Sequence, residues 1–189
     1  MAIVERVSLP MESDEYREVE QLFEESNTKG FRIKSIDKVH NYELLQQFEN
    51  KKEWYLETYG HVRVVKVFHG TRKDNVSSIL RSNFDLDRSG SHIGHRFGVG
   101  VSFSAQSRYA SHYCDDIGEK TMLLCKVLVS EIKEVPEVRN PIFVSRQPPE
   151  IPGREPLRYD TTAKNKEIMD VIVKYHMHSY YPTHVITFQ

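Results

Sequence analysis

The apolar residues of this chain repeat with helical spacing in two early segments. The first predicted helix begins at Ser13, a favourable capping residue, and ends near Lys29 and Gly30. The second begins at Asn41 and ends at Gly60. Their apolar faces consist of Tyr16, Val19, Leu22 and Phe23 in the first helix, and of Leu44, Leu45, Phe48, Tyr55, Leu56 and Tyr59 in the second.

Runs rich in β-branched and aromatic residues mark the strands, most of which lie later in the chain. Strands are predicted over residues 31–34 with a continuation over 36–39, and over 62–68, 101–103, 122–129, 170–175 and 184–188. Two short helices are also predicted, one capped by Asp74 or Asn75 and one over residues 105–114. Because helices come early and strands late, this order predicts an α+β domain with mixed or antiparallel sheets rather than a doubly wound parallel sheet.

Length and charge narrow the class of protein. The 189 residues fit one domain, 1–189, and residues 136–156 hold six of the eight prolines, which predicts extended surface structure there. The formal net charge of −1 argues against nucleic-acid binding by bulk electrostatics. Two cysteines fit a reducing compartment, and there is neither a secretory signal nor an apolar run of about 18 residues. We therefore expect an intracellular protein of the cytoplasm and/or nucleus with no membrane contact, and the opening segment indicates a piece of a larger protein.

Two segments carry candidate chemistry. His69-Gly70-Thr71 follows a β-branched strand, where a glycine lets a ligand approach the backbone, although a strand-end histidine and a turn glycine are more often structural. Gly98-Val99-Gly100 precedes a short strand and a helix that carries Tyr109 and Tyr113. These two rings either stack on a planar ligand or simply pack on the core. The glycine pair is a weak match to a dinucleotide fingerprint, because the third glycine is missing.

Other reactive residues offer weaker signals. His92 and His95 lie in a polar loop over residues 85–96, without a further ligand at metal-binding spacing, so solvated histidines are favoured and no metal is expected. Cys114 has no visible activating partner, and Cys125 lies on a predicted buried strand.

Several motifs in order resemble one family over nearly the whole chain. They are His69-Gly70-Thr71, Asn83-Phe84-Asp85, Gly98-Val99-Gly100 with Ser102-Phe103-Ser104, Tyr109-Ala110-Ser111-His112-Tyr113, and Tyr181-Pro182-Thr183-His184-Val185-Ile186. Together they resemble the catalytic domain of the poly(ADP-ribose) polymerase (PARP) family. Val39-His40-Asn41 and the helix after it look like the mono-ADP-ribosylating branch, near the CCCH zinc-finger PARPs and the zinc-finger antiviral protein.

The resemblance implies an ADP-ribosyltransferase fold, with two small sheets around an NAD+ cleft and flanking helices. It implies transfer of ADP-ribose from NAD+ to protein acceptors with release of nicotinamide, by a monomer that needs no metal. By position, His69 would hydrogen-bond the nicotinamide ribose, the Gly70 backbone would bind the carboxamide, and Tyr113 would stack on the nicotinamide ring. Thr71 would belong to the same cofactor-binding set, and the loop over residues 85–96, with His92, would cover the adenine side.

The departures from the family pattern are equally informative. Ser102 stands where the family has tyrosine, Ser104 where it has alanine, and Ala110 where a serine binds the carboxamide. The third catalytic position, glutamate in polymer-forming members, aligns with Val171, while Glu167 is four residues away. The family triad thus becomes His69, Ser102 and Val171. Valine cannot support chain growth, so at most single units would be transferred.

Three interpretations follow from these residues. The lost ring contact and hydrogen bond together cost on the order of 1–4 kcal/mol, which weakens a transferase without abolishing it. The first interpretation is therefore an active but weakened mono-ADP-ribosyltransferase. The second is a catalytically degenerate PARP-like module for interaction or scaffolding, without NAD+ turnover. The third is an α+β ligand-binding domain unrelated to NAD+.

Overall fold

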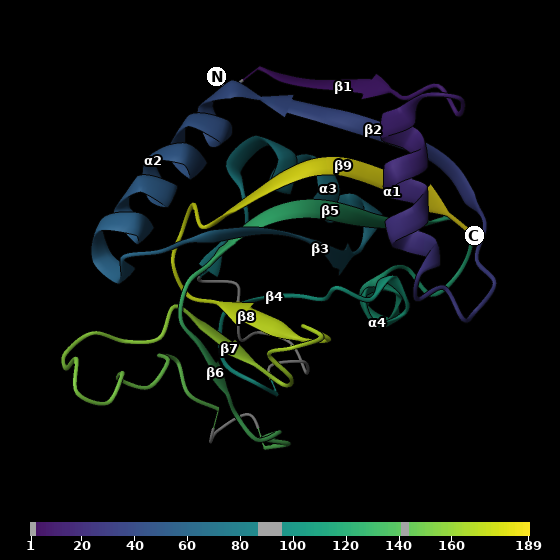
Figure 1. Ribbon diagram of the computed structural model, residues 1–189. Coiled ribbons are helices and arrows are strands. Elements are labelled where there is room, and N and C mark those ends of the chain that lie inside the picture. The colour runs from purple at the N-terminus through teal and green to yellow at the C-terminus, as the bar shows by residue number, and fades with distance from the viewer. Residues whose placement is uncertain (1–2, 87–95, 141–143) are drawn as a thin grey trace.

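Two sheets make up the centre of the structure, a computed structural model that describes residues 3–86, 96–140 and 144–189 (Figure 1). The larger sheet has five strands in the order β1-β2-β9-β5-β3, and the smaller has four in the order β4-β8-β7-β6. Among these strands β6 and β7 run parallel, whereas the other neighbours are antiparallel. The predicted α+β class with mixed and antiparallel sheets is therefore confirmed.

The larger sheet contains the longer strands of the structure. Its members are β1 (Val4–Ser8), β2 (Ile33–Asn41), β3 (Arg63–Thr71), β5 (Lys120–Val129) and β9 (Tyr180–Phe188). The predictions for β3 and β5 are confirmed, and the two predicted pieces over 31–39 are one strand, β2. Strand β9 begins four residues before the predicted start at His184, and β1 was not predicted.

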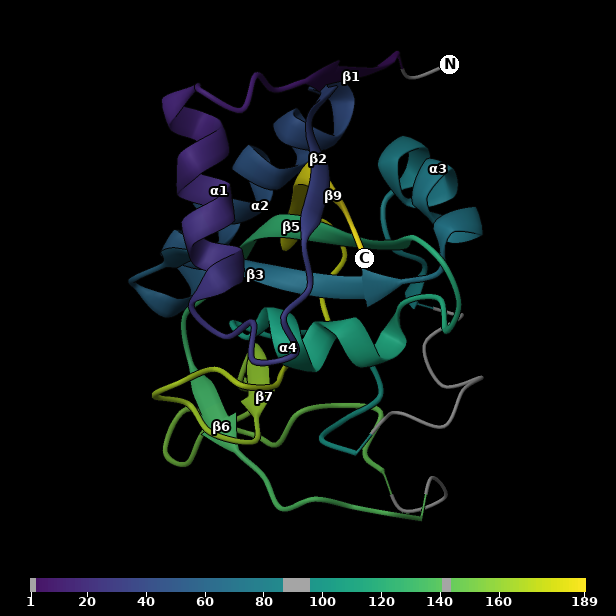
Figure 2. The same ribbon diagram turned by 90° about the vertical axis from the view of Figure 1, so that its right-hand side faces the viewer.

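Three helices cover this sheet: α1 (Asp14–Glu24), α2 (Tyr42–Tyr59) and α3 (Lys73–Ser82). Helices α1 and α3 lie on opposite faces (Figure 2). The alternation of β5 explains this, because Leu123 and Cys125 pack with α3 whereas Met122 and Leu124 pack with α1. Helix α2 packs its own apolar face on the same side as α1. Both faces of the central part of the larger sheet are therefore buried, whereas its edge strand β1 is largely exposed.

The predicted start of α1 and both predicted ends of α2 are correct, whereas the predicted end of α1 is wrong. Ser13 caps α1, because its hydroxyl accepts from the Tyr16 N–H at 3.2 Å. Asn41 caps α2, and Gly60 ends it with φ of 82°. Helix α1 stops at Glu24, short of Gly30, because the Asn27 side chain bonds both the N–H and the carbonyl of Phe31 and turns the chain.

The predicted cap of α3 is also wrong. This helix begins at Lys73, one residue before Asp74, and its N-cap residue Arg72 makes no side-chain cap hydrogen bond. The Asp115 carboxylate instead accepts from the Lys73 N–H at 2.9 Å. Asn75 lies within the helix and donates instead to the Thr71 hydroxyl at 3.2 Å.

The smaller sheet consists of short strands, and only two of them were predicted. They are β4 (Val101–Phe103), β6 (Ile132–Glu134), β7 (Thr161–Ala163) and β8 (Ile172–Lys174). The predicted strands over 101–103 and 170–175 correspond to β4 and β8. Of the proline-rich residues 136–156, the described ones form no strand of either sheet. The predicted helix over 105–114 is two shorter pieces, α4 (Ser107–Ala110) and η2 (Ser111–Tyr113).

Candidate active site

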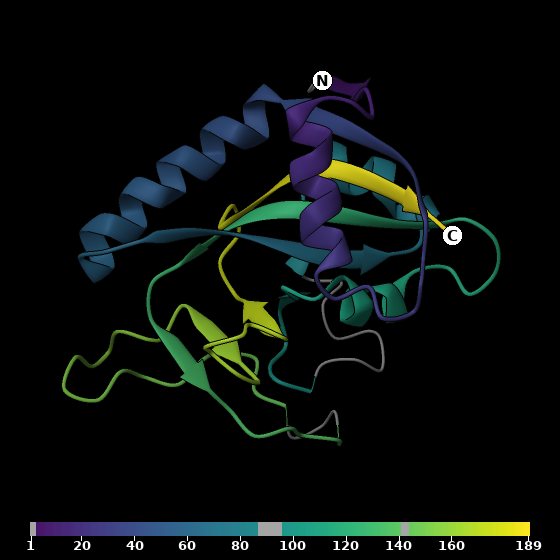
Figure 3. The same cartoon turned by 45° about the vertical axis from the view of Figure 1, so that its right-hand side comes forward.

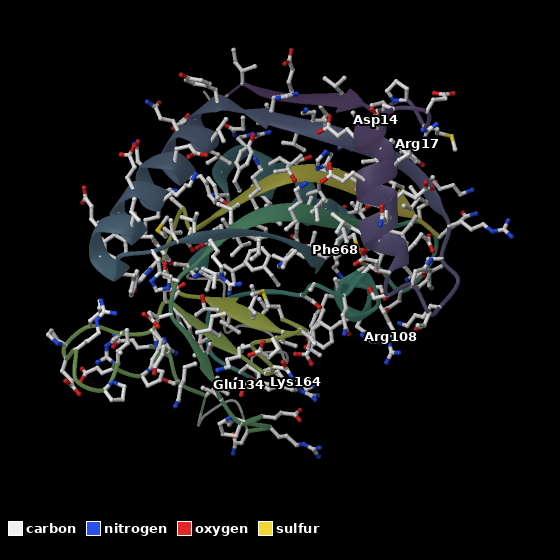
Figure 4. All side chains as sticks on the ribbon, in the orientation of Figure 1. Asp14, Arg17, Phe68, Arg108, Glu134 and Lys164 are labelled. Carbon is white, nitrogen blue, oxygen red and sulfur yellow. The ribbon has the colours of Figure 1, made fainter. Side chains whose placement is uncertain are left out.

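The two sheets meet beside the end of β3. The backbone of Phe68 exchanges two hydrogen bonds with Ser104, with N–O distances of 2.7 and 2.9 Å. Phe68 lies at the centre of the molecule, while Arg108 extends from α4 at its edge (Figure 4). The next two residues of β3 are His69 and Gly70, so the candidate residues lie at the junction of the sheets.

A backbone hydrogen bond fixes the His69 ring. Its Nδ1 lies 2.9 Å from the carbonyl oxygen of Ser102 in β4. Because a carbonyl oxygen only accepts, Nδ1 carries the proton, and Nε2 of the neutral ring is left as an acceptor. Burial lowers the pKa of His69 to about 4, against the opposing effect of the bond to Ser102. At pH 7 the site therefore presents a neutral imidazole that can accept a hydrogen bond from a ligand hydroxyl.

Aromatic rings surround this imidazole. The ring centroid of His69 lies 4.6 Å from that of Phe84 and 5.6 Å from that of Phe103. Tyr180 packs behind both, at 5.2 Å from Phe84 and 5.6 Å from Phe103. This shell of Phe84, Phe103 and Tyr180 holds the orientation of the imidazole and covers much of its surface, and the resulting desolvation lowers the pKa of His69.

Gly70 lies directly against the helical segment that follows β4. A Cβ at this position would come within 1.8 Å of the Ala110 carbonyl oxygen and 3.2 Å of the Tyr113 Cβ. Figure 3 shows α4 below α1 and beside β3, as the contacts of these elements require. The structure thus brings together Gly70, Ala110 and Tyr113, to which the family resemblance assigns the nicotinamide, with Thr71 buried beside them.

The Tyr113 side chain is available to a ligand. It is 43% exposed, its hydroxyl is 3.0 Å from that of Tyr109, and the two rings are 5.7 Å apart. Tyr109 is more deeply placed and packs against the cluster of Phe97, Val171 and Val173. The sequence left ligand stacking and core packing open for this pair. Tyr109 contributes to the core, whereas Tyr113 keeps a free ring face.

The remaining predicted site residues divide into three groups. Ser102 contacts the site through its carbonyl oxygen, which orients His69. Val171 belongs to the separate apolar cluster with Phe97 and Val173, and its assignment to the third catalytic position stays a prediction. His92 and most of the loop over residues 85–96 lie outside the described residues.

Tyr180 is a residue of this site that sequence reasoning missed. Its side chain is fully buried, and within the described parts of the chain its hydroxyl has no hydrogen-bond partner. Burial, with the negative charge of Asp85 as a smaller cause, raises the pKa of this phenol. Tyr180 pairs with Val127 across β9 and β5. The predicted last strand began only after Pro182, because proline is uncommon inside strands. A strand that begins at residue 180 places Tyr180 at this junction.

The rest of the described chain adds few reactive groups. Cys114 is buried, and burial raises the pKa of its thiol to about 11, so it is a poor nucleophile. Among residues 3–86, 96–140 and 144–189, no three His, Cys, Asp or Glu side chains form a cluster that could hold a metal ion. In the same residues no helix is both long and apolar enough to cross a membrane.

Comparison with known proteins identifies the family. Residues 13–179 match the poly(ADP-ribose) polymerase catalytic domain. Over 125 residues the chain is 29% identical to a probable poly(ADP-ribose) polymerase of Dictyostelium discoideum, covering 62% of this chain and 37% of that protein. Over 195 residues it is 26% identical to human protein mono-ADP-ribosyltransferase PARP14, covering 97% of this chain but 10% of that protein. The chain belongs to the family of PARP catalytic domains, whose members use NAD+ to transfer ADP-ribose.

Proposed function

We propose that this domain is a mono-ADP-ribosyltransferase that transfers single ADP-ribose units from NAD+ to protein acceptors. The observation that carries the proposal is the geometry of His69. Its Nδ1 proton is engaged by Ser102, so Nε2 accepts a hydrogen bond from a ribose hydroxyl of NAD+. The exposed face of Tyr113 and the close backbone of Gly70 supply a wall and a floor for the nicotinamide ring.

In the proposed reaction, the bond between the ribose C1′ and the nicotinamide nitrogen breaks. The electron pair leaves with neutral nicotinamide, and positive charge develops on the ribose. A nucleophile of the acceptor then donates an electron pair to C1′ and loses its proton. The work of the domain is to hold the dinucleotide and orient the leaving ring, so a site with few polar groups is sufficient.

Single-unit transfer is supported by the side chain that aligns with the third catalytic position and by a buried residue of the shell around His69. Val171 aligns with the glutamate of polymer-forming members, and Tyr180 packs on the shell around His69. Neither side chain is a carboxylate, so neither can polarise the hydroxyl of a previously attached ADP-ribose.

We further propose that this chain is a single domain within a larger monomeric protein, and that this protein belongs to the branch of the CCCH zinc-finger PARPs. The chain spans only 37% and 10% of the two relatives named above.

A second candidate function is a PARP-like interaction module that no longer turns over NAD+. The observation that favours it is the replacement of two ligand-binding positions by Ser102 and Ala110. The buried Tyr180 hydroxyl beside the site, which has no hydrogen-bond partner among the described residues, adds to it. Under this alternative the aromatic shell around His69 is part of a closed core.

Incubation with labelled NAD+, followed by measurement of label on the domain and on added protein, tests the proposal. We expect incorporation of one unit per site and a loss of about 10- to 100-fold in His69→Ala, because a hydrogen bond to substrate is worth about 1.4–2.8 kcal/mol. His40→Ala is the matched control, since His40 is exposed on β2. Absence of label together with no NAD+-induced rise in Tm would favour the interaction module.

A further inference from the structure

The orientation of Tyr113, the proposed wall for the nicotinamide ring, depends on its contacts with Tyr109. Tyr113 ends the short helix η2, and its side chain is 43% exposed. Its hydroxyl oxygen lies 3.0 Å from that of Tyr109, and the two ring centroids are 5.7 Å apart. Among residues 3–86, 96–140 and 144–189, this hydroxyl has no other hydrogen-bond partner and this ring no other aromatic neighbour. Without these contacts, such an exposed ring samples several rotamers.

Tyr109 itself is held by the smaller sheet. It lies on α4, and its ring packs against the apolar cluster of Phe97, Val171 and Val173. Val173 belongs to β8, and Val171 directly precedes that strand. Burial raises the pKa of the Tyr109 phenol, so its hydroxyl stays protonated at neutral pH and can either donate to Tyr113 or accept from it. The ring of Tyr109 is therefore a fixed point from which its hydroxyl can orient a neighbour.

The main chain that carries both tyrosines is fixed on either side of them. Before them, the Ser107 hydroxyl donates to the carbonyl oxygen of Phe23 in α1 at 2.6 Å. After them, the Cys114 thiol donates to the carbonyl oxygen of Thr121 in β5 at 3.0 Å. Because the backbone is held at both ends, the part of Tyr113 that is free to move is its side chain.

We propose that Tyr109 is a positioning residue, whose hydroxyl holds the Tyr113 ring in the orientation that stacks on the nicotinamide ring of NAD+. This inference rests on the proposed function, because it takes the nicotinamide as the ligand of Tyr113. A ring that is already held in place loses less conformational freedom when the ligand binds, so the affinity rises. Through Tyr109 the wall is also connected to the cluster that contains Val171, the residue aligned with the third catalytic position.

Removal of the Tyr109 hydroxyl alone tests this role. Tyr109→Phe keeps the ring in the apolar cluster but releases Tyr113, so the Kd for NAD+ measured by calorimetry should rise about two- to tenfold. The Kd for ADP-ribose, which lacks the nicotinamide ring, should stay unchanged, whereas a merely structural role would weaken the binding of both ligands. Tyr175→Phe is the matched control, because Tyr175 packs on the same cluster but its hydroxyl lies 2.6 Å from that of Thr162. This control should leave both Kd values unchanged.

The two hydroxyls act through one another, so the effects of removing them should not add. Tyr113→Phe should raise the Kd for NAD+ by about the same factor as Tyr109→Phe, and the double variant should raise it no further. Additive losses, an equal loss of ADP-ribose affinity, or an unchanged Kd for NAD+ in Tyr109→Phe would overturn the proposal.

A measurement without ligand separates this inference from the proposed function. Side-chain NMR couplings of Tyr113 should report one χ1 rotamer in the unaltered chain and in Tyr175→Phe, but several rotamers in Tyr109→Phe. If the unaltered chain binds no NAD+, the proposed function fails, and these couplings alone decide whether Tyr109 positions Tyr113. Couplings that are the same in Tyr109→Phe as in the unaltered chain overturn the inference in either case.

Discussion

The two sheets are stabilised in different ways. The central strands of the larger sheet are buried on both faces by apolar side chains, among them Leu124 on the side of α1. The smaller sheet contains a fully buried ion pair, in which Lys174 Nζ lies 2.5 Å from Asp160 Oδ2 and 2.7 Å from the hydroxyl of Thr161. Lys174 also lies 5.1 Å from the centroid of Tyr55 in α2. Apolar packing tolerates changes of shape, whereas a buried ion pair tolerates the loss of neither partner.

The largest effect is expected at this ion pair. Lys174→Met leaves the Asp160 carboxylate buried and unpaired, and should lower the free energy of unfolding by about 3–5 kcal/mol. The measurement is urea unfolding followed by circular dichroism. The double variant Lys174→Met with Asp160→Asn should regain most of that loss, because no unpaired charge remains. A single variant as stable as the unaltered chain would mean that the smaller sheet does not depend on the pair.

The larger sheet should respond to volume rather than to charge. Leu124→Ala should cost about 3 kcal/mol through lost burial and a residual cavity, whereas Leu124→Met should cost less than about 1.5 kcal/mol. The same denaturant titration measures both variants. Equal losses in the alanine and methionine variants would contradict the description of this sheet as an apolar, shape-tolerant core.

The junction of the sheets should show a distinctive pH dependence. The folded-state pKa of His69 is about 4, below the value of 6.5 for an unperturbed histidine, so the unfolded chain binds this proton more readily. Its contribution to stability is therefore complete above pH 6.5 and is lost as the pH falls toward 4. NAD+ binding that requires neutral His69 should stay constant from pH 8 to about 5. Calorimetric titration with NAD+ across this pH range measures the affinity. A fall in affinity centred near pH 6.5 would contradict an imidazole that stays neutral down to about pH 5.

The smallest effect is expected at the surface of the larger sheet. Lys66 on β3 forms an exposed ion pair with Glu18 on α1. Exposed pairs contribute about 0–1 kcal/mol, so Lys66→Ala should change the free energy of unfolding by less than about 1 kcal/mol. The change should shrink further in 1 M salt. A loss comparable with that of Lys174→Met would erase the contrast between exposed and buried charge.

The difference between the apolar larger sheet and the ion-paired smaller sheet also explains which strands the sequence could predict. Strands β3 and β5 are long runs of apolar and β-branched residues, and their pattern indicates a strand without further information. Strand β7 is Thr161–Ala163, which looks like a polar turn. It is buried because it lies between β6 and β8, where Asp160 meets Lys174, a partner 14 residues away. No local pattern reveals either pairing.

Part of the candidate site could likewise be predicted from the sequence, and part could not. The family resemblance assigned Gly70, Ala110 and Tyr113 to one ligand, and the structure places the three residues side by side. The sequence did not predict the aromatic shell around His69. The last strand was predicted to begin at His184, after Pro182, whereas β9 begins at Tyr180. The family match supports NAD+ use, whereas the roles of Ser102 and Val171 stay predictions.

The contact between Gly70 and Ala110 has a consequence for the way related sequences are interpreted. Any side chain at position 70 would collide with a main-chain oxygen, which cannot rotate away as a flexible side chain can. Selection for folding alone would keep glycine there, even in descendants that had abandoned catalysis. An invariant glycine across relatives would then report on architecture, and evidence for retained enzymatic activity has to come from the imidazole beside it.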